Sequence, residues 1–164
     1  MMNALVVFES QFGNTRHVAE VVAKRLEAYG KVHLTPYTAY TPALLEGVDL
    51  LVLGGPTQAH GVTVEMRRFM SELKPPARPL KAAAFDTRVK GPLFLWGSAA
   101  REIAVHLERN GFTIVAPPES FLVTLSKEPV LHAGEERHAQ EWAARLGAVL
   151  GAPAPVAVGA RRGE

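Results

Sequence analysis

A cluster of hydrogen-bonding side chains surrounds one glycine near the amino terminus, in the segment Ser10-Gln11-Phe12-Gly13-Asn14-Thr15. The hydroxyls of Ser10 and Thr15 can donate hydrogen bonds to phosphate oxygens, and the amide of Asn14 can donate another. A glycine turn that runs into a helix also brings backbone N–H groups together, and the helix N-terminus adds a partial positive charge. The segment has neither the lysine of a Walker P-loop nor the G-x-G-x-x-G of a dinucleotide fingerprint. The pattern is typical of an anion site, and the alternative of a plain strand-to-helix turn capped by Asn14 or Thr15 stays open.

Two further segments follow apolar runs and carry candidate ligand-binding groups. Paired glycines begin the segment Gly54-Gly55-Pro56-Thr57-Gln58-Ala59-His60-Gly61, and they let a flat ligand approach the backbone closely. His60 can stack on a ring or hydrogen-bond to it, although a lone loop histidine is more often a surface residue. The third segment runs from Asp86 to Gly97 and contains the apolar run Pro92–Trp96. This run is either a short strand or inner wall of the core, or a set of aromatic side chains, Trp96 among them, that flank a planar ligand.

Composition narrows the chemistry that these segments can perform. The 164 residues include no cysteine, which excludes a disulfide scaffold, a thiolate metal site and a cysteine nucleophile. The six histidines are scattered without an i, i+4 pair, so we expect no metal site. A hydrolase built on Ser10, His60 and Asp86 would lack the G-x-S-x-G nucleophile elbow, and a phospho-acceptor receiver would lack clustered carboxylates at its strand ends. The net charge of +2 is too small to favour a nucleic-acid partner.

Hydrophobic periodicity alternates between strand-like and helix-like stretches along the chain. Predicted strands cover residues 4–8, 32–37, 49–53, 81–85 and 112–115, the last interrupted at Pro117-Pro118 and resumed at 121–125. Predicted helices cover about 18–29, 64–74, 98–111 and 139–150, with a short helix or turn at 41–46. This alternation is typical of βαβ units, so the predicted fold class is α/β: a three-layer α/β/α, doubly wound domain with a five-stranded parallel sheet. In such sheets ligands bind outside the carboxyl ends of the strands, so the three segments should meet in one site.

The first two segments resemble the FMN-binding loops of the flavodoxin family. Ser10–Thr15 is similar to the phosphate loop that the family writes [ST]-x-T-G-x-T, and Gly54–Thr57 is similar to its second FMN loop. The element order over residues 1–150 also matches, which implies the flavodoxin-like strand order 2-1-3-4-5. Phe12 stands where the family has a threonine whose hydroxyl contacts phosphate.

The resemblance implies FMN as the cofactor and assigns a part to each segment. The first segment would hold the phosphate through hydroxyls and backbone N–H groups, and the second and third would pack on either side of the isoalloxazine ring. His60 and Trp96 are the candidate stacking residues, and the Asp86 carboxylate is a candidate neighbour of the ring. The implied cofactor-binding residues are Ser10, Gln11, Phe12, Gly13, Asn14, Thr15, Pro56, Thr57, Gln58, His60, Gly61, Asp86 and Trp96.

We therefore expect residues 1–151 to form a flavodoxin-like domain that binds FMN and acts in electron transfer or as a small flavin-dependent oxidoreductase. The alternative is a binding or regulatory module with this fold that has lost FMN. Electrons would be exchanged with a redox partner protein or a small-molecule donor or acceptor. Residues 152–164, rich in Ala, Pro, Gly and Arg, are expected to be a mobile tail. Because the chain has no membrane-length apolar run and no signal-peptide pattern, we expect a cytoplasmic protein with no membrane partner.

Overall fold

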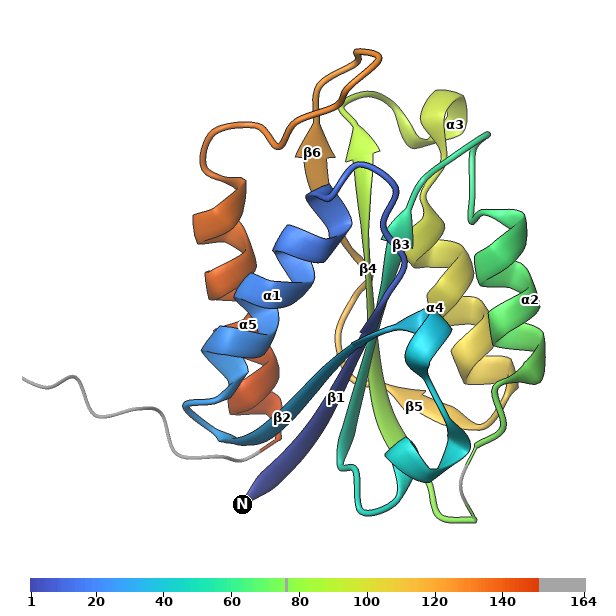
Figure 1. The fold of residues 1–164 in the computed structure, drawn as a ribbon, viewed down its shortest axis with the longest axis vertical. Coiled ribbons are helices and arrows are strands. Elements are labelled where there is room, and N and C mark those ends of the chain that lie inside the picture. The colour runs from blue at the N-terminus through green and yellow to red at the C-terminus, as the bar shows by residue number, and fades with distance from the viewer. Residues whose placement is uncertain (76, 151–164) are drawn as a thin grey trace, which may run out of the picture.

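A computed structural model describes residues 1–75 and 77–150 of the chain. They form a central parallel sheet with helices on both of its faces (Figure 1). The predicted tail at 152–164 lies outside the described residues. The predicted three-layer α/β/α architecture is confirmed.

The sheet has the strand order β2-β1-β3-β4-β5, which confirms the predicted order. Its strands are β1 (Met2–Phe8), β2 (Gly30–Pro36), β3 (Leu50–Pro56), β4 (Leu80–Val89), β5 (Phe112–Ile114) and β6 (Glu119–Val123). All the pairs between these strands are parallel. The carboxyl ends of β1, β3, β4 and β6 therefore lie at one edge of the sheet, at the top of Figure 1.

Two short strands, β5 and β6, pair one after the other along the outer side of β4, where a single strand was predicted. β5 pairs with the start of β4, at residues 80–82, and β6 pairs with its end, at residues 85–89. Pro117 and Pro118 lie between them, and a proline has no N–H to donate to the ladder. The predicted interruption is thus confirmed, and the described sheet has six strands instead of the predicted five.

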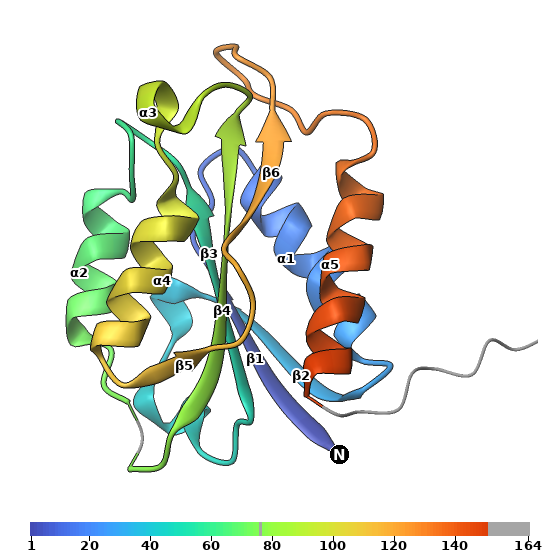
Figure 2. The ribbon, with the colours of Figure 1, turned by 180° about the vertical axis from the view of Figure 1, so that it is seen from behind.

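Two pairs of helices cover the two faces of the sheet (Figures 1 and 2). The helices are α1 (Asn14–Leu26), α2 (Val64–Glu72), α3 (Leu93–Trp96), α4 (Ala99–Arg109) and α5 (Glu135–Val149), with 3₁₀ turns η1 (Tyr37–Ala39) and η2 (Pro42–Leu45). α1 and α5 bury one core with the even-numbered residues of β1, such as Val6, and α2 and α4 bury the other with odd-numbered ones, such as Leu5. A strand with both faces buried reads as a continuous apolar run, which is why β1 could be predicted.

Several helices and strands begin earlier or end later than predicted, because polar residues at their ends are part of the helix or strand. α1 begins at Asn14 rather than near Val18, and Gly13, not Asn14 or Thr15, is its N-cap. β4 continues through Asp86 to Val89, so the third segment begins as strand rather than as loop. The apolar run that follows β4 is neither a strand nor core: it forms the four-residue helix α3 and leaves Phe94 85% exposed.

A histidine between two glutamates joins β6 to α5. His138 Nε2 lies 2.8 Å from Glu119 Oε1, and His138 Nδ1 lies 3.1 Å from Glu135 Oε2. Partial burial alone would lower the His138 pKa, but the hydrogen bonds and charges of Glu135 and Glu119 outweigh it and raise the pKa above 6.5. Arg145, 3.8 Å from Glu119, is the other charged group of this cluster.

We expect this cluster to make stability depend on pH. Because the folded-state pKa of His138 is raised, its contribution is fully present below the unfolded pKa of about 6.5 and is lost as pH rises through the folded value. Urea unfolding across this window should therefore show a steeper loss of unfolding free energy in the wild type than in His138→Gln. Equal slopes would contradict the assignment.

Candidate functional site

Four connections meet at the carboxyl edge of the sheet. They are loop 1 (residues 9–13), loop 2 (57–63), loop 3 (90–98, which contains α3) and loop 4 (124–134). The parallel pairing of β1, β3, β4 and β6 brings them together, as predicted for the first three.

Loop 1 leaves the N-terminus of α1 open. Gly13 takes the left-handed conformation at φ 87°, and its N–H donates to Ser10 Oγ at 3.1 Å. Thr63 and Ser98 cap α2 and α4 with their hydroxyls, whereas no side chain in the described part of the protein caps α1. The first-turn N–H groups of α1 have no intrahelical acceptor, so they are available to an anion.

A pocket of about 130 Å³ opens beside this helix end. Its lining comes from loop 1, α1, the end of β3, loop 2, β4, β6 and loop 4: Ser10, Gln11, Phe12, Asn14, Thr15, Pro56, Thr57, Gln58, Thr87, Arg88, Val89, Val123 and Pro129. Eight of the predicted site residues are among these thirteen, and Gly13, His60, Gly61, Asp86 and Trp96 are not. Pockets that bury a whole drug-sized ligand usually measure about 300–1,000 Å³, so this one can take a phosphate-sized part of a ligand.

Hydroxyl groups form the inner wall of the pocket. Thr15 Oγ1 and Thr87 Oγ1 lie 2.8 Å apart, and both residues are buried. One hydrogen joins the two oxygens, so the other hydroxyl hydrogen is free to donate to a ligand. The Asn14 side-chain amide donates one hydrogen bond, of 2.6 Å, to the carbonyl oxygen of Pro129, and this bond holds loop 4 against α1.

Sequence reasoning missed five lining residues: Thr87, Arg88, Val89, Val123 and Pro129. A signal for the strand residues among them is present in the sequence: Phe85, Thr87 and Val89 alternate with polar residues, which continues the strand pattern of β4 past Phe85. Arg88 is the one cation among the lining residues. It donates to the carbonyls of Val89 and Gly91, each at 3.2 Å, and within the described ranges it forms no ion pair with a carboxylate.

Loop 2 is a tight hairpin that turns at Ala59 and His60. Gln58 and Gly61 exchange backbone hydrogen bonds of 2.8 and 3.0 Å, and the two residues between them have φ values of 45° and 73°. Left-handed backbone is unfavourable for non-glycine residues, so tertiary contacts must hold this turn. His60 is exposed at the tip, outside the pocket lining, while the Gln58 side chain hydrogen-bonds Gln11 of loop 1.

The far end of loop 2 is held by α4. Glu102 accepts a hydrogen bond from Val62 N at 3.0 Å and one from Arg67 Nη2 at 2.8 Å. Burial opposes ionisation of Glu102, but these hydrogen bonds and the nearby charges prevail and hold its pKa below 4.5. The carboxylate is therefore ionised at neutral pH and anchors the loop.

Asp86 lies on the α4 face of β4 and is fully buried, so its place differs from the predicted start of a ligand-binding loop. Its Oδ2 accepts from Ser98 Oγ at 2.7 Å, Ala100 N at 3.0 Å and Thr57 Oγ1 at 3.1 Å. The carboxylate thus ties loop 2 to the N-terminus of α4. It positions the loops rather than lining the pocket.

Trp96 lies at the end of α3, away from the pocket lining, and is 38% exposed. A Cβ on Gly91 would lie 2.1 Å from Trp96 Nε1, so the indole packs on the backbone of loop 3 itself. Several exposed apolar side chains lie on loops 1, 3 and 4, at the same end of the sheet as the pocket: Phe12, Phe94, Leu95, Leu125 and Val130. An exposed apolar surface of this kind is typical of a ligand or partner site.

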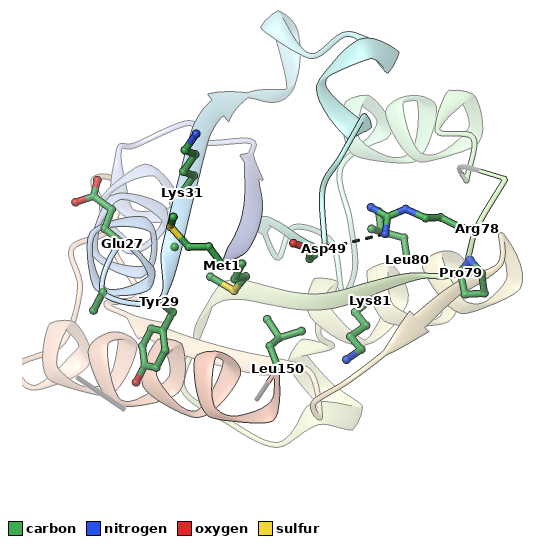
Figure 3. Close-up of a pocket in the computed structure, with 13 residues that line it drawn as sticks. Met1, Glu27, Tyr29, Lys31, Asp49, Arg78, Pro79, Leu80, Lys81 and Leu150 are labelled. Carbon is green, nitrogen blue, oxygen red and sulfur yellow. Dashed lines mark ion pairs between the residues drawn. The ribbon is translucent and has the colours of Figure 1, made fainter. Parts of the chain in front are cut away.

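A larger hollow, of about 810 Å³, lies at the opposite end of the sheet (Figure 3). Starts of strands line it, together with Leu150 and the Asp49–Arg78 ion pair of 3.9 Å. In a doubly wound sheet ligands bind at the carboxyl ends of the strands, so the pocket beside loop 1 is the stronger candidate. No helix in the two described ranges has the length and hydropathy needed to cross a membrane.

The strand order, the two helical layers and the loop-built pocket define a flavodoxin-like fold. A flavodoxin from the domain Archaea matches the structure with a TM-score of 0.75 at 20% identity, over 92% of this chain and 99% of that one. A short-chain flavodoxin associated with a non-canonical PDU bacterial microcompartment gives 0.72 at 20% identity, over 93% and 100%. The rubredoxin:oxygen oxidoreductase of Desulfovibrio gigas gives 0.71 at 17% identity, over 91% of this chain and 36% of that one.

The likeness to these structures is one of fold. No protein-family model and no curated protein sequence matches the chain.

Proposed function

We propose that this protein binds FMN at the carboxyl edge of its sheet and acts in electron transfer or flavin-dependent reduction. The observation that carries the proposal is the uncapped N-terminus of α1, which lies beside a pocket lined by hydroxyls. Solved structures named as flavodoxins share the fold at TM-scores of 0.72 and 0.75, which supports the choice of ligand.

The residues present fit a phosphate group. Ser10 Oγ already accepts a hydrogen bond from Gly13 N, so its own hydrogen is free to donate, as is one hydrogen of the Thr15–Thr87 pair. Backbone N–H groups of the first turn of α1 and the Arg88 guanidinium supply further donors of the right charge. Phe12, 58% exposed, offers a ring at the rim where the related pattern has a hydroxyl.

FMN supplies reversible one- and two-electron chemistry when bound, and the protein supplies binding, orientation and charge. The phosphate end would enter the pocket, and the ring would lie on the surface between loops 2 and 3. The exposed apolar residues of loop 3, Phe94 and Leu95, would cover it in part. Electrons would be exchanged at this edge with a redox partner protein or a small-molecule donor or acceptor.

A titration of the purified protein with FMN, followed by flavin fluorescence, tests the proposal. We expect saturable one-to-one binding. We expect riboflavin, which lacks the phosphate, to bind at least about 100-fold more weakly, because two charge-assisted hydrogen bonds are worth about 3 kcal/mol or more together.

Fluorescence that stoichiometric protein leaves unchanged would overturn the proposal. The binding or regulatory module without FMN would then be the better reading. Equal affinity for FMN and riboflavin would contradict the assignment of the pocket to the phosphate, and would leave flavin binding itself intact.

A further inference from the structure

Glu9 is a buried carboxyl at the junction of loops 1 and 2. It directly follows β1, its N–H donates to Gly54 O at 3.0 Å, and the residue is only 5% exposed. Its side chain reaches Thr63, the N-cap of α2. A buried carboxylate normally has a cation or several donors, and none of the described cations forms an ion pair with Glu9.

One hydroxyl is the hydrogen-bond donor to both side-chain oxygens of Glu9. Both Oε1 and Oε2 lie 2.7 Å from Thr63 Oγ1. The Thr63 hydroxyl has one hydrogen, and its oxygen also accepts from Met66 N at 3.0 Å. The two Glu9 oxygens therefore share a single donor, which does not replace the water that a buried carboxylate loses, and the neutral acid is favoured.

The surroundings of Glu9 also disfavour a negative charge. Burial raises the pKa of Glu9, the Thr63 hydroxyl offsets part of this, and the charge of Glu65 on α2 raises the pKa further. On the other side of loop 2, Arg67 is paired with Glu102 at 2.8 Å and is not free to compensate.

We propose that Glu9 is the proton-binding group of this site: it keeps its proton above the pH at which an ordinary glutamate ionises, and its charge weakens FMN binding once it ionises. The inference rests on the proposed function for its effect on FMN, but the protonation of Glu9 is a property of the protein alone. On ionisation the O–H bond of Glu9 breaks and the proton goes to solvent. The carboxylate then lies next to Gly55 of β3: a Cβ at this glycine would be 3.6 Å from Glu9 Oε1.

The same charge links proton uptake to reduction of the site. Added electrons would increase the negative charge beside loop 2, and an ionised Glu9 would respond by taking one proton from solvent to form one O–H bond. The electrons come from the reductant, dithionite in the test below. The reduction potential of the loaded protein should therefore fall more steeply with pH when Glu9 is present.

Infrared spectroscopy of the protein without FMN tests the protonation directly. The wild type should show a carboxylic-acid C=O band that is absent from Glu9→Gln and that disappears only above the pH of an ordinary glutamate, about 4.3. Glu65→Gln, a change at an exposed residue of the same helix end, should keep the band. A band that titrates at the ordinary pH, or that Glu9→Gln retains, would overturn the proposal.

The pH dependence of FMN affinity tests the coupling. The wild type should lose affinity by on the order of tenfold as Glu9 ionises, and Glu9→Gln, which stays neutral, should show no such loss. Thr63→Ser keeps the hydroxyl and should behave like the wild type, which guards against a folding defect in the glutamine variant. Parallel pH profiles of affinity and reduction potential in wild type and Glu9→Gln would overturn the coupling.

Failure of this inference is distinguishable from failure of the proposed function. A protein that does not bind FMN refutes the proposed function and leaves the infrared result readable. A protein that binds FMN with the same pH profile in both variants refutes the role of Glu9 and leaves FMN binding intact.

Discussion

Replacement of Gly13 by valine is expected to abolish saturable FMN binding. Gly13 caps α1 at φ 87° and ψ −6°, a conformation that costs a residue with a Cβ about 1–2 kcal/mol and a β-branched residue at least as much. A valine would turn the peptide towards a β conformation and move the N–H groups that open into the pocket. Losing two anion contacts lowers affinity at least about 100-fold, which a fluorescence titration detects.

The chain contains a matched control at Gly134. This residue caps α5 at φ 86° and ψ −10°, again with no side-chain cap, and a Cβ at either glycine meets no atom within 4 Å. Gly134→Val should therefore lose a similar unfolding free energy and keep the wild-type affinity for FMN. If the two variants lose affinity equally, the phosphate loop is not at Gly13.

Replacement of Asp86 by alanine is expected to lower the unfolding free energy by about 3–5 kcal/mol. The change removes the shared acceptor of Ser98 Oγ, Ala100 N and Thr57 Oγ1, so three donors lose their partner in or near the core. Loop 2 loses its tie to β4, so FMN affinity should fall as well. Urea unfolding with an unchanged m-value measures the loss of stability.

Asp86→Asn and Asp49→Ala are the controls for that prediction. The asparagine keeps an oxygen that can accept from the same donors, so it should lose much less stability than the alanine. Asp49 is a partly exposed acceptor of Asn3 N at 2.9 Å, and its loss should cost about 1 kcal/mol. A loss below about 1 kcal/mol in Asp86→Ala would mean that the buried network is not cooperative.

The loop 1 site was largely readable from the sequence, whereas the loop 3 site was not. Ser10, Asn14 and Thr15 line the pocket because they are held by local geometry: a strand end, one glycine turn and a helix start. Asp86 and Trp96 were placed by the predicted strand end at Phe85 and by the resemblance to the flavodoxin family, in a segment whose length as a loop depended on where β4 ends. β4 runs to Val89 because β3 and β6 both pair with its last residues, and those partners are distant in sequence.

The sequence patterns by themselves determined the layers of the fold and the end of the sheet that carries the candidate site, because hydrophobic periodicity and glycine-containing turns are local. The strand order was what the resemblance to the flavodoxin family implied, and the structure confirms it. The tertiary structure alone decided that Thr87 faces Thr15, that Asp86 turns away from the pocket and that Glu9 lies against Thr63. These contacts join residues 54 or more positions apart, or depend on which face of a strand a side chain takes, and only the packed sheet fixes both.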